Sequence, residues 1–208
     1  MRVRWLERAP EQVRGRALLS ALREELGLVP RDAEEDAAGI AAAGTMPLAH
    51  RASLAITPRS RYMEMSADYA LLAHEQLICS AQIHVEVRDR DQAVAVSPGV
   101  SRHLPLLLAL SASSPWWGGE DTGYASNRAM MFQQLPTAGL PFHFQKWSHF
   151  ERFVYDQRKT GIIDHMNEIR WDIRPSPHLG TIEVRIFDGV SNIAELGALV
   201  ALTHCLIV

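Results

Sequence analysis

Two segments with strictly alternating side chains constrain the fold of this chain more than any other feature. Charged residues alternate with isoleucine, valine or tryptophan in EIRWDIR (168–174) and in TIEVRIFD (181–188), which is the period of a half-buried β-strand. The connection PSPHLG is short enough to join them as an antiparallel hairpin. One face of this hairpin is expected to carry six charged side chains: Glu168, Arg170, Asp172, Arg174, Glu183 and Arg185.

A third strand and several helices are expected around the hairpin. The segment 78–87 alternates in the same way and places His84 on its polar face. Pro98 and Gly99 should separate two helical pieces, and 115–145 should form a long ordered loop with one helical turn at SNRAMMFQQ. Apolar spacing and capping residues predict helices over 10–27, 32–43, 62–76 and 147–161, pieces around 93–96 and 102–114, and a largely buried final helix after Asn192. This mixture of elements predicts an α+β fold.

Composition and absent motifs exclude several functions. The 208 residues carry a net charge of -3, which removes the usual electrostatic signature of nucleic-acid binding. The patterns GxxxxGKS/T, GxGxxG, GxSxG and HExxH are absent, so the common nucleotide-binding, hydrolase and zinc-protease signatures are excluded. The isolated Cys79 and Cys205 are typical of reduced thiols in a cytoplasmic protein.

The apolar run at the end of the sequence has two implications. Residues 193–208 are fewer than the ~20 that span a membrane, and they include Glu195 and His204, so no membrane association is expected. The sequence also stops in the middle of this pattern. We therefore expect the chain to be cut through a core helix and its fold to be incomplete.

The charged face of the hairpin has two interpretations. It could be a solvent-exposed face whose cross-strand ion pairs are each worth under about 1 kcal/mol. It could instead be the floor of a funnel-shaped site, with carboxylates that bind Mg2+ or Mn2+ and arginines that bind phosphate or a substrate carboxylate. His84 on a neighbouring strand favours the second interpretation, although a lone histidine on a strand is more often structural.

Two long motifs in the second half of the chain resemble one enzyme family. SASSPWWGGEDTGYASNRAMMFQQLPTAG, followed by WDIRPSPHLGTIEVRIFD, resembles the bacterial type 2 glutamate-cysteine ligases, or carboxylate-amine ligases, particularly the actinobacterial members. AAGTMPLA and LICSAQIHVEV are similar to the same family more loosely. The resemblance covers residues 40–208 of a single, partial catalytic domain and matches 1–39 weakly. It implies a glutamine-synthetase-like antiparallel sheet with helices on one face.

The resemblance also implies an activity, the ATP-dependent coupling of a carboxylate to an amine. ATP would phosphorylate a carboxylate, typically the side chain of glutamate, and an amine such as that of cysteine would displace phosphate from the acyl phosphate. Such a ligase would serve glutathione-like thiol biosynthesis. The implied cofactors are ATP and Mg2+ or Mn2+, and the implied partners are small-molecule substrates and further copies of the chain, with no nucleic acid.

Site residues follow from the same resemblance. Glu183 and His84 match metal-binding positions, and Arg185 matches the arginine that contacts the transferred phosphoryl group. Arg128 and Arg174 are similar to catalytic positions near substrate or phosphate, and Arg128 joins Arg185 as an expected ATP-binding residue. The neighbouring tryptophans, Trp116 and Trp117, are expected either to line the amine side of the site or to anchor their loop.

Departures from the family pattern leave two hypotheses. Family members begin with a strand of the Gly-Val-Glu-Glu-Glu type, whereas the early acidic cluster 34–36 is explained by a helix start. Glu86 stands where the family usually has glycine. The chain is therefore either a piece of an ATP-dependent ligase or a catalytically inactive fragment or pseudoenzyme that binds only a ligand or a partner. An incomplete sheet predicts self-association in both cases.

Overall fold

The computed structural model describes residues 42–208 apart from 51, 53–55 and 57, and these residues belong to one compact unit. The helix expected over 10–27 and nearly all of the one over 32–43 lie outside the described residues. The helices are α2 (Ser60–Tyr69), α3 (Leu71–His74), α4 (Arg90–Ser101), α5 (Leu104–Ser111), α6 (Asn127–Phe132), α7 (Trp147–Lys159) and α8 (Ile193–Ile207), with a 3-10 helix η2 (Met166–Glu168). The strands are β1 (Ile83–Glu86), β2 (Trp116–Trp117), β3 (Glu120–Asp121), β4 (Ile173–Ser176) and β5 (Thr181–Val184).

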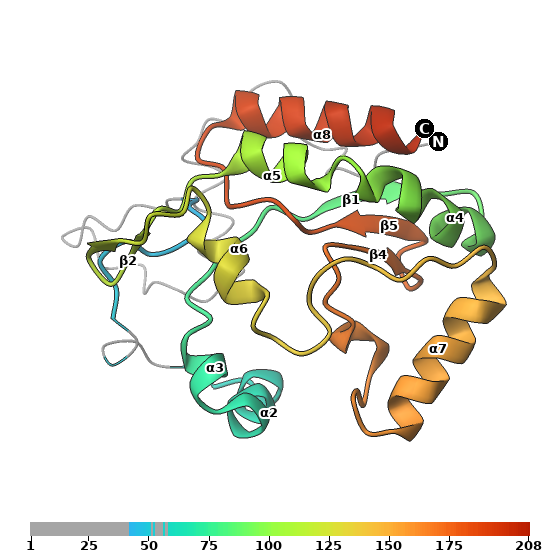
Figure 1. Cartoon of the computed structure of the whole chain (residues 1–208), viewed down its shortest axis with the longest axis horizontal. Helices are drawn as coiled ribbons and strands as arrows, with labels where there is room; N and C mark the ends of the chain where they lie inside the picture. Colours follow the sequence, from blue (N-terminus) through green and yellow to red (C-terminus); the bar gives the residue numbers. More distant parts are fainter. Residues whose placement is uncertain (1–41, 51, 53–55, 57) are drawn as a thin grey trace, which may run out of the picture. The chain divides into compact units, whose positions relative to one another are not determined.

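A three-stranded antiparallel sheet with the order β1-β5-β4 organises the described residues (Figure 1). The central strand β5 pairs with both neighbours, so that His84, Glu183 and Arg174 lie opposite one another in one row. Side chains alternate between the two faces of a strand, and the adjacent rows are therefore apolar on the opposite face. The expected α+β class, with an antiparallel sheet and helices on one face, is confirmed.

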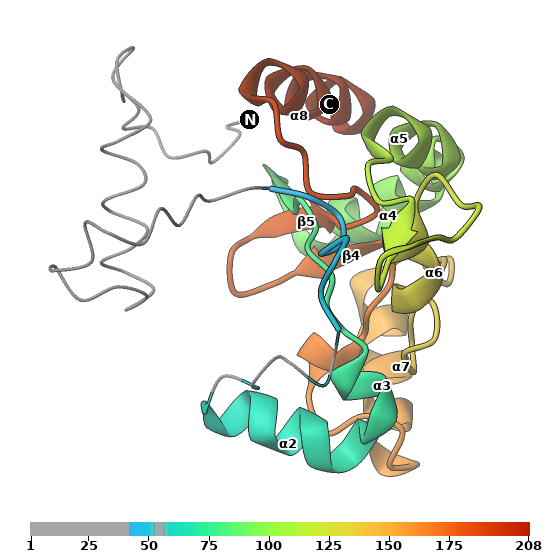
Figure 2. The ribbon, with the colours of Figure 1, turned by 90° about the vertical axis from the view of Figure 1, so that its left-hand side faces the viewer.

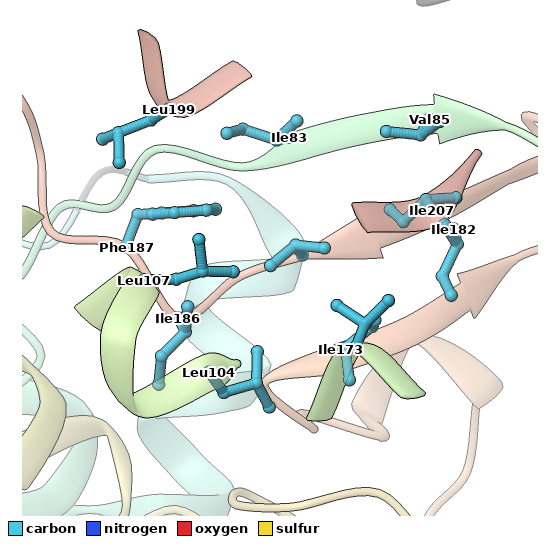
Figure 3. Close-up of a cluster of buried hydrophobic side chains, with 12 residues drawn as sticks. Ile83, Val85, Leu104, Leu107, Ile173, Ile182, Ile186, Phe187, Leu199 and Ile207 are labelled. Atoms are coloured by element: carbon cyan, nitrogen blue, oxygen red, sulfur yellow. The ribbon is translucent and has the colours of Figure 1, made fainter. Parts of the chain in front are cut away.

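The apolar face of the sheet is covered by three helices. Figure 2 shows α5 and α8 on the same side of the sheet, and α4 contacts both β4 and β5. The buried side chains between the sheet and these helices include Ile83, Val85, Leu104, Leu107, Ile173, Ile182, Phe187, Leu199 and Ile207 (Figure 3). Burial of this apolar face fixes which side of every strand faces inward, because a shift of one residue would expose the whole set.

A second core consists mainly of aromatic rings and attaches α7 to the sheet. The buried Trp171 lies just before β4, and its ring centre is 5.3 Å from that of Phe153 and 6.1 Å from that of Phe150, both on α7. Val94 of α4 and Ile169 are buried in the same cluster. These contacts fix the segment that leads into β4, and therefore the position of Arg174 on that strand.

The hairpin is present, but its first strand is shorter than the alternating pattern predicts. β4 begins at Ile173, and Glu168 belongs to η2, where its side-chain Oε1 accepts hydrogen bonds from the backbone N–H groups of Asp164 and His165. The 3-10 turn and the burial of Trp171 replace the first half of the expected strand. The prediction that Glu168 shares the sheet face is therefore wrong.

Two helical predictions are wrong in position. A single helix was expected over 62–76, but Ala70, with φ 44°, separates α2 from α3. Pro98 does not separate the next two helices, because it lies inside α4, and the chain bends by 69° only after Ser101. Pro98 has no N–H group to donate within the helix. The hydroxyl of Ser101 donates to the carbonyl of Ser97, the residue before Pro98.

The final helix is less buried than predicted. Asn192 caps α8 by accepting a hydrogen bond from the N–H of Ala194, as the capping pattern indicates. The buried residues of α8 form a single stripe of Leu199, Thr203 and Ile207, so the expectation of a largely buried helix is wrong. The helical turn expected within 115–145 is confirmed as α6, whereas the short β2–β3 pair in the same segment was not predicted.

Within the described residues, no single helix is both long and apolar enough to cross a membrane. Only α4 and α5 taken together pass that test of length and composition, and they are bent relative to each other.

Candidate functional site

The polar face of the sheet centres on one buried carboxylate. Glu183, on the central strand β5, is 2% exposed. Its Oε2 accepts from Arg174 Nε at 2.7 Å, and its Oε1 accepts from Arg185 Nη1 at 2.6 Å. His84 Nε2 lies 3.9 Å from Oε1. The row of paired residues on β1, β5 and β4 therefore brings His84, Glu183 and Arg174 together, and Arg185, the first residue after β5, joins them.

This cluster is not a solvent-exposed set of ion pairs. The side chains of Arg174, Arg185 and Glu183 are 14%, 13% and 3% exposed. The interpretation of the hairpin as a solvated charged face is therefore wrong for these three residues. Buried charges persist only where partners and hydrogen bonds offset the loss of water, and Arg174 meets this need with further bonds to the carbonyls of Asn167 and Ile169.

Electrostatics keep the central carboxylate ionised and its neighbouring imidazole neutral. Burial alone would raise the pKa of Glu183, but the guanidiniums of Arg185 and Arg174 outweigh it and hold the pKa below its usual range. Burial lowers the pKa of His84 by more than Glu183 raises it. His84 Nδ1 is 2.9 Å from the hydroxyl of Thr181, which fixes the ring at the end of the row.

A cavity of about 450 Å³ borders the arginines of this cluster. One side is formed by Arg170, Arg174 and Arg185, and the remaining wall comes largely from α2, η2 and the segment that leads into β1. Glu183 and His84 are not among its lining residues. The cavity is also lined by Glu64, Asp68, Asp164 and Glu168. Its arginines offer guanidinium donors that suit a phosphate or carboxylate ligand, and Glu183, which holds two of them, is not part of the wall.

The described residues do not by themselves fit a divalent cation. Mg2+ requires about six oxygen ligands in near-octahedral geometry. Glu183 and His84 do lie together, but both carboxylate oxygens already accept hydrogen bonds from guanidiniums. No group of three or more histidine, cysteine, aspartate or glutamate side chains suited to a metal occurs in the described part of the chain.

Arg128 lies behind the cluster and contacts backbone. It is 2% exposed, and its Nη1 and Nη2 each donate at 2.9 Å, to the carbonyls of Ile186 and Arg185. Its guanidinium also lies 5.1 Å from the ring centre of Phe132. Burial lowers the pKa of Arg128 to about 10, and nearby Asp188 opposes this shift. Although Arg128 borders the cavity, these two hydrogen bonds hold the chain just beyond β5.

The remaining charged residues of the hairpin segment have separate environments. The guanidinium of Arg170 lies 4.9 Å from the ring centre of Tyr69 on α2, at the cavity wall. Asp172 is buried, and its Oδ2 accepts from Gln133 Nε2 at 3.4 Å. Burial raises the pKa of Asp172 more than Arg128 lowers it. Arg174, Glu183 and Arg185 alone therefore form the ion-paired centre of the site.

The two tryptophans do not line the cavity. Trp116 and Trp117 form β2, and Trp116 is 46% exposed. The hydroxyl of Thr45 donates to the carbonyl of Trp116 at 2.9 Å. Trp116 is therefore tied to the chain through its backbone, and neither tryptophan contributes to the wall around the arginines.

Asp188, the last residue of the TIEVRIFD motif, was not among the predicted site residues. Asp188 is fully buried, and its carboxylate accepts hydrogen bonds from the hydroxyls of Ser114 and Ser126, both at 2.7 Å. A Cβ on Gly44 would lie 2.7 Å from the Asp188 carboxyl carbon, so glycine is required there. An acidic residue after an apolar strand, with serine-rich segments elsewhere, was the only signal for this network.

Comparison with known proteins gives one consistent result. The model of Glutamate-cysteine ligase family 2 matches residues 10–208, so the match begins well before residue 40. "Putative glutamate--cysteine ligase 2" from Mycobacterium tuberculosis (strain ATCC 25618 / H37Rv) is 59% identical over 187 residues, which are 90% of this chain and 50% of that protein. "Putative glutamate--cysteine ligase 2-1" from Mycobacterium sp. (strain KMS) is 56% identical over 190 residues, 91% of this chain and 50% of that protein. The chain spans about half the length of these relatives.

Proposed function

Because the chain belongs to glutamate-cysteine ligase family 2, we propose that it contributes to the active site of an ATP-dependent carboxylate-amine ligase. An oxygen of the substrate carboxylate attacks the γ-phosphorus of ATP, the bond to ADP breaks, and an acyl phosphate forms. The amine nitrogen then attacks the acyl carbon, phosphate leaves, and the nitrogen loses a proton to give an amide. The names of the relatives support glutamate as the carboxylate and cysteine, or another amine, as the acceptor.

The observation that carries this proposal is a pair of guanidiniums held at a cavity wall by one buried carboxylate. Arg174 and Arg185 both border the cavity, and Glu183 fixes both of them. Cations that are already in place stabilise charge on transferring phosphoryl oxygens without reorganising during the reaction. We assign Arg185 to the transferred phosphoryl group and Arg174 to a neighbouring phosphate or carboxylate.

ATP and a divalent cation, Mg2+ or Mn2+, are included as requirements of the proposed reaction. Glu183 and His84 remain the candidates for contact with the cation, but the described residues do not complete its ligand set. No step is assigned to the cation for this reason. The contribution assigned to this chain is the binding of phosphate and the stabilisation of its negative charge.

An ADP-release assay tests the proposal. The chain is incubated with ATP, Mg2+, glutamate and cysteine, and ADP formation is expected to depend on both amino acids. Arg185→Gln should lower the rate at least about a hundredfold, because it removes a cation from the transferring group. Arg152→Gln, on the exposed surface of α7, is the matched control and should leave the rate unchanged. The absence of ADP above background would contradict the ligase proposal and leave ligand or partner binding as the function.

A cytoplasmic location and self-association complete the proposal. Cys79 and Cys205 are free and exposed, which fits a reducing compartment. Leu106 and Leu110 of α5 are 53% and 56% exposed, and Ile193 of α8 is 81% exposed, which supports association with a second copy of the chain. Size-exclusion chromatography with light scattering should detect an oligomer, and a monodisperse monomer would contradict this part of the proposal.

A further inference from the structure

A hydrogen-bond network around the buried Asp188 connects three separate parts of the chain. Asp188 accepts from the hydroxyls of Ser114 and Ser126 and, at 2.9 Å, from the N–H of Ser113. Its own N–H donates to the hydroxyl of Ser111 at 3.2 Å. All three donors to the carboxylate are neutral, and the network therefore joins the segment after α5, the start of α6 and the segment after β5 as part of the fold.

The same serines fix the start of α6, which carries Arg128. The hydroxyl of Ser126 accepts from the N–H of Ala129 at 3.2 Å and so caps the helix. The hydroxyl of Ser114 accepts from the N–H of Arg128 at 3.1 Å. The backbone of Arg128 is therefore fixed in position. Its guanidinium extends from this fixed backbone to the chain beyond β5.

The guanidinium of Arg128 in turn holds the backbone of Arg185. Its two terminal nitrogens donate to two consecutive carbonyls, those of Arg185 and Ile186. A planar fork that bonds two successive carbonyls restrains the peptide plane after Arg185, a restraint that a single ammonium group does not reproduce. Phe132 adds a second contact, because the guanidiniums of Arg128 and Arg185 lie 5.1 and 5.6 Å from the centre of its ring.

We infer that Arg128 is a positioning residue, which acts by holding the backbone and guanidinium of Arg185 in place at the cavity wall. The network of Asp188, Ser114 and Ser126 in turn holds the backbone of Arg128 at the start of α6. The catalytic meaning of this inference rests on the proposed function, but the restraint on Arg185 does not. In this role Arg128 acts through Arg185, whereas the family resemblance implies direct contact with substrate or ATP.

Side-chain NMR on the full chain tests the restraint without an activity measurement. The protein is labelled with ¹⁵N-arginine, and the Nε–Hε signal of Arg185 is assigned by its loss in Arg185→Lys. Arg128→Lys keeps the charge but removes the fork, so the heteronuclear NOE of Arg185 should fall from the value of a rigid group toward that of a mobile one. Arg152→Lys is the control and should not change it. If Arg128 only stabilised the fold, folded Arg128→Lys measured well below its melting temperature would keep Arg185 rigid, and this result would overturn the inference.

Kinetics give a second and separate measurement if the chain forms ADP. Arg128→Lys should lower kcat about ten- to a hundredfold through misplacement of Arg185, with KM for the amine within about twofold of the parent value. A raised KM with unchanged kcat would indicate direct substrate binding and overturn the inference. If no protein forms ADP, the proposed function fails, but the NMR result still decides the inference.

A second variant covers a failure of Arg128→Lys to fold. Ser114→Ala removes the hydroxyl that joins Asp188 to the N–H of Arg128 and leaves the guanidinium intact. The heteronuclear NOE of Arg185 should fall in Ser114→Ala, but by less than in Arg128→Lys. A folded Ser114→Ala protein with the parent NOE at Arg185 would overturn the inference.

Discussion

Glu183 and Asp188 are buried carboxylates on the same stretch of chain, but their partners differ in kind. Glu183 accepts from two guanidiniums that border a cavity. Asp188 accepts from serine hydroxyls and a backbone N–H, and it is fully buried. The first carboxylate holds two cations at a cavity wall, whereas the second joins segments of the fold. The comparison shows that burial of an acid does not by itself identify a functional group, because the charge of its donors and their access to a cavity decide its role.

The largest expected effect comes from loss of the Asp188 network. Asp188→Ala leaves three donors without their acceptor and creates a cavity where three segments meet, so the free energy of unfolding should fall by about 3 to 6 kcal/mol. Urea denaturation followed by circular dichroism measures the change. Asp188→Asn, which keeps one acceptor oxygen, is the matched variant and should lose less. If Asp188→Ala lowers the free energy of unfolding by less than about 1 kcal/mol, Asp188 does not join segments of the fold in the way that separates it from Glu183.

A smaller loss of stability is expected at the charged centre. Glu183→Gln replaces the shared acceptor of two guanidiniums by an amide, which has one acceptor oxygen and leaves one buried arginine poorly paired. The free energy of unfolding should fall by about 2 to 4 kcal/mol. Affinity for ATP, measured by calorimetry, should fall in the same variant because Arg174 and Arg185 lose their fixed positions. Parent-like ATP affinity in a folded Glu183→Gln protein would show that Glu183 does not organise these arginines.

The smallest change in the free energy of unfolding is expected at Asp172, a third buried acid. Substitution there should raise stability slightly instead of lowering it. Burial raises the pKa of Asp172, so the folded state holds its proton more tightly than the unfolded state, and stability falls as pH rises through the raised pKa. Asp172→Asn keeps an oxygen for Gln133 and carries no charge, and it should therefore be slightly more stable than the parent at neutral pH. Denaturation near pH 7 and near pH 4 should show this advantage shrinking in acid. A lower stability at neutral pH would show that Asp172 is needed as an anion beside Arg128.

Much of the sheet could be predicted from local sequence, but the residues at which its strands and the neighbouring helices begin and end could not. Alternation in IEVR and in IHVE identified β5 and β1, because one face of each strand is buried and a two-residue period is the direct consequence. The same alternation extended falsely to Glu168, since the aromatic cluster around Trp171 and the 3-10 turn of η2 override it. Pro98 was expected to end a helix, yet α4 continues to Ser101 because its packing against the sheet outweighs the lost hydrogen bond.

The site was predicted in part for the same reason. Spacing by two along one strand placed Glu183 and Arg185 on one face, and the hairpin brought Arg174 to them. The contacts of Arg128 were not accessible from spacing, because its partners lie 57 and 58 residues away and are backbone carbonyls. Asp188 was missed for the same cause, since its serine donors lie 62 and 74 residues away along the chain.

The sequence by itself determined the α+β class, the antiparallel hairpin, the cap of the final helix and the family to which the chain belongs. These features are either local, being set by side-chain period and capping chemistry, or carried by long motifs. The tertiary structure alone decided which charged residues meet at the cavity and which lock the fold behind it. The polarity of a side chain can be read from its residue type in the sequence. The hydrogen-bond donors that it needs when it is buried come from distant segments, which only folding brings together.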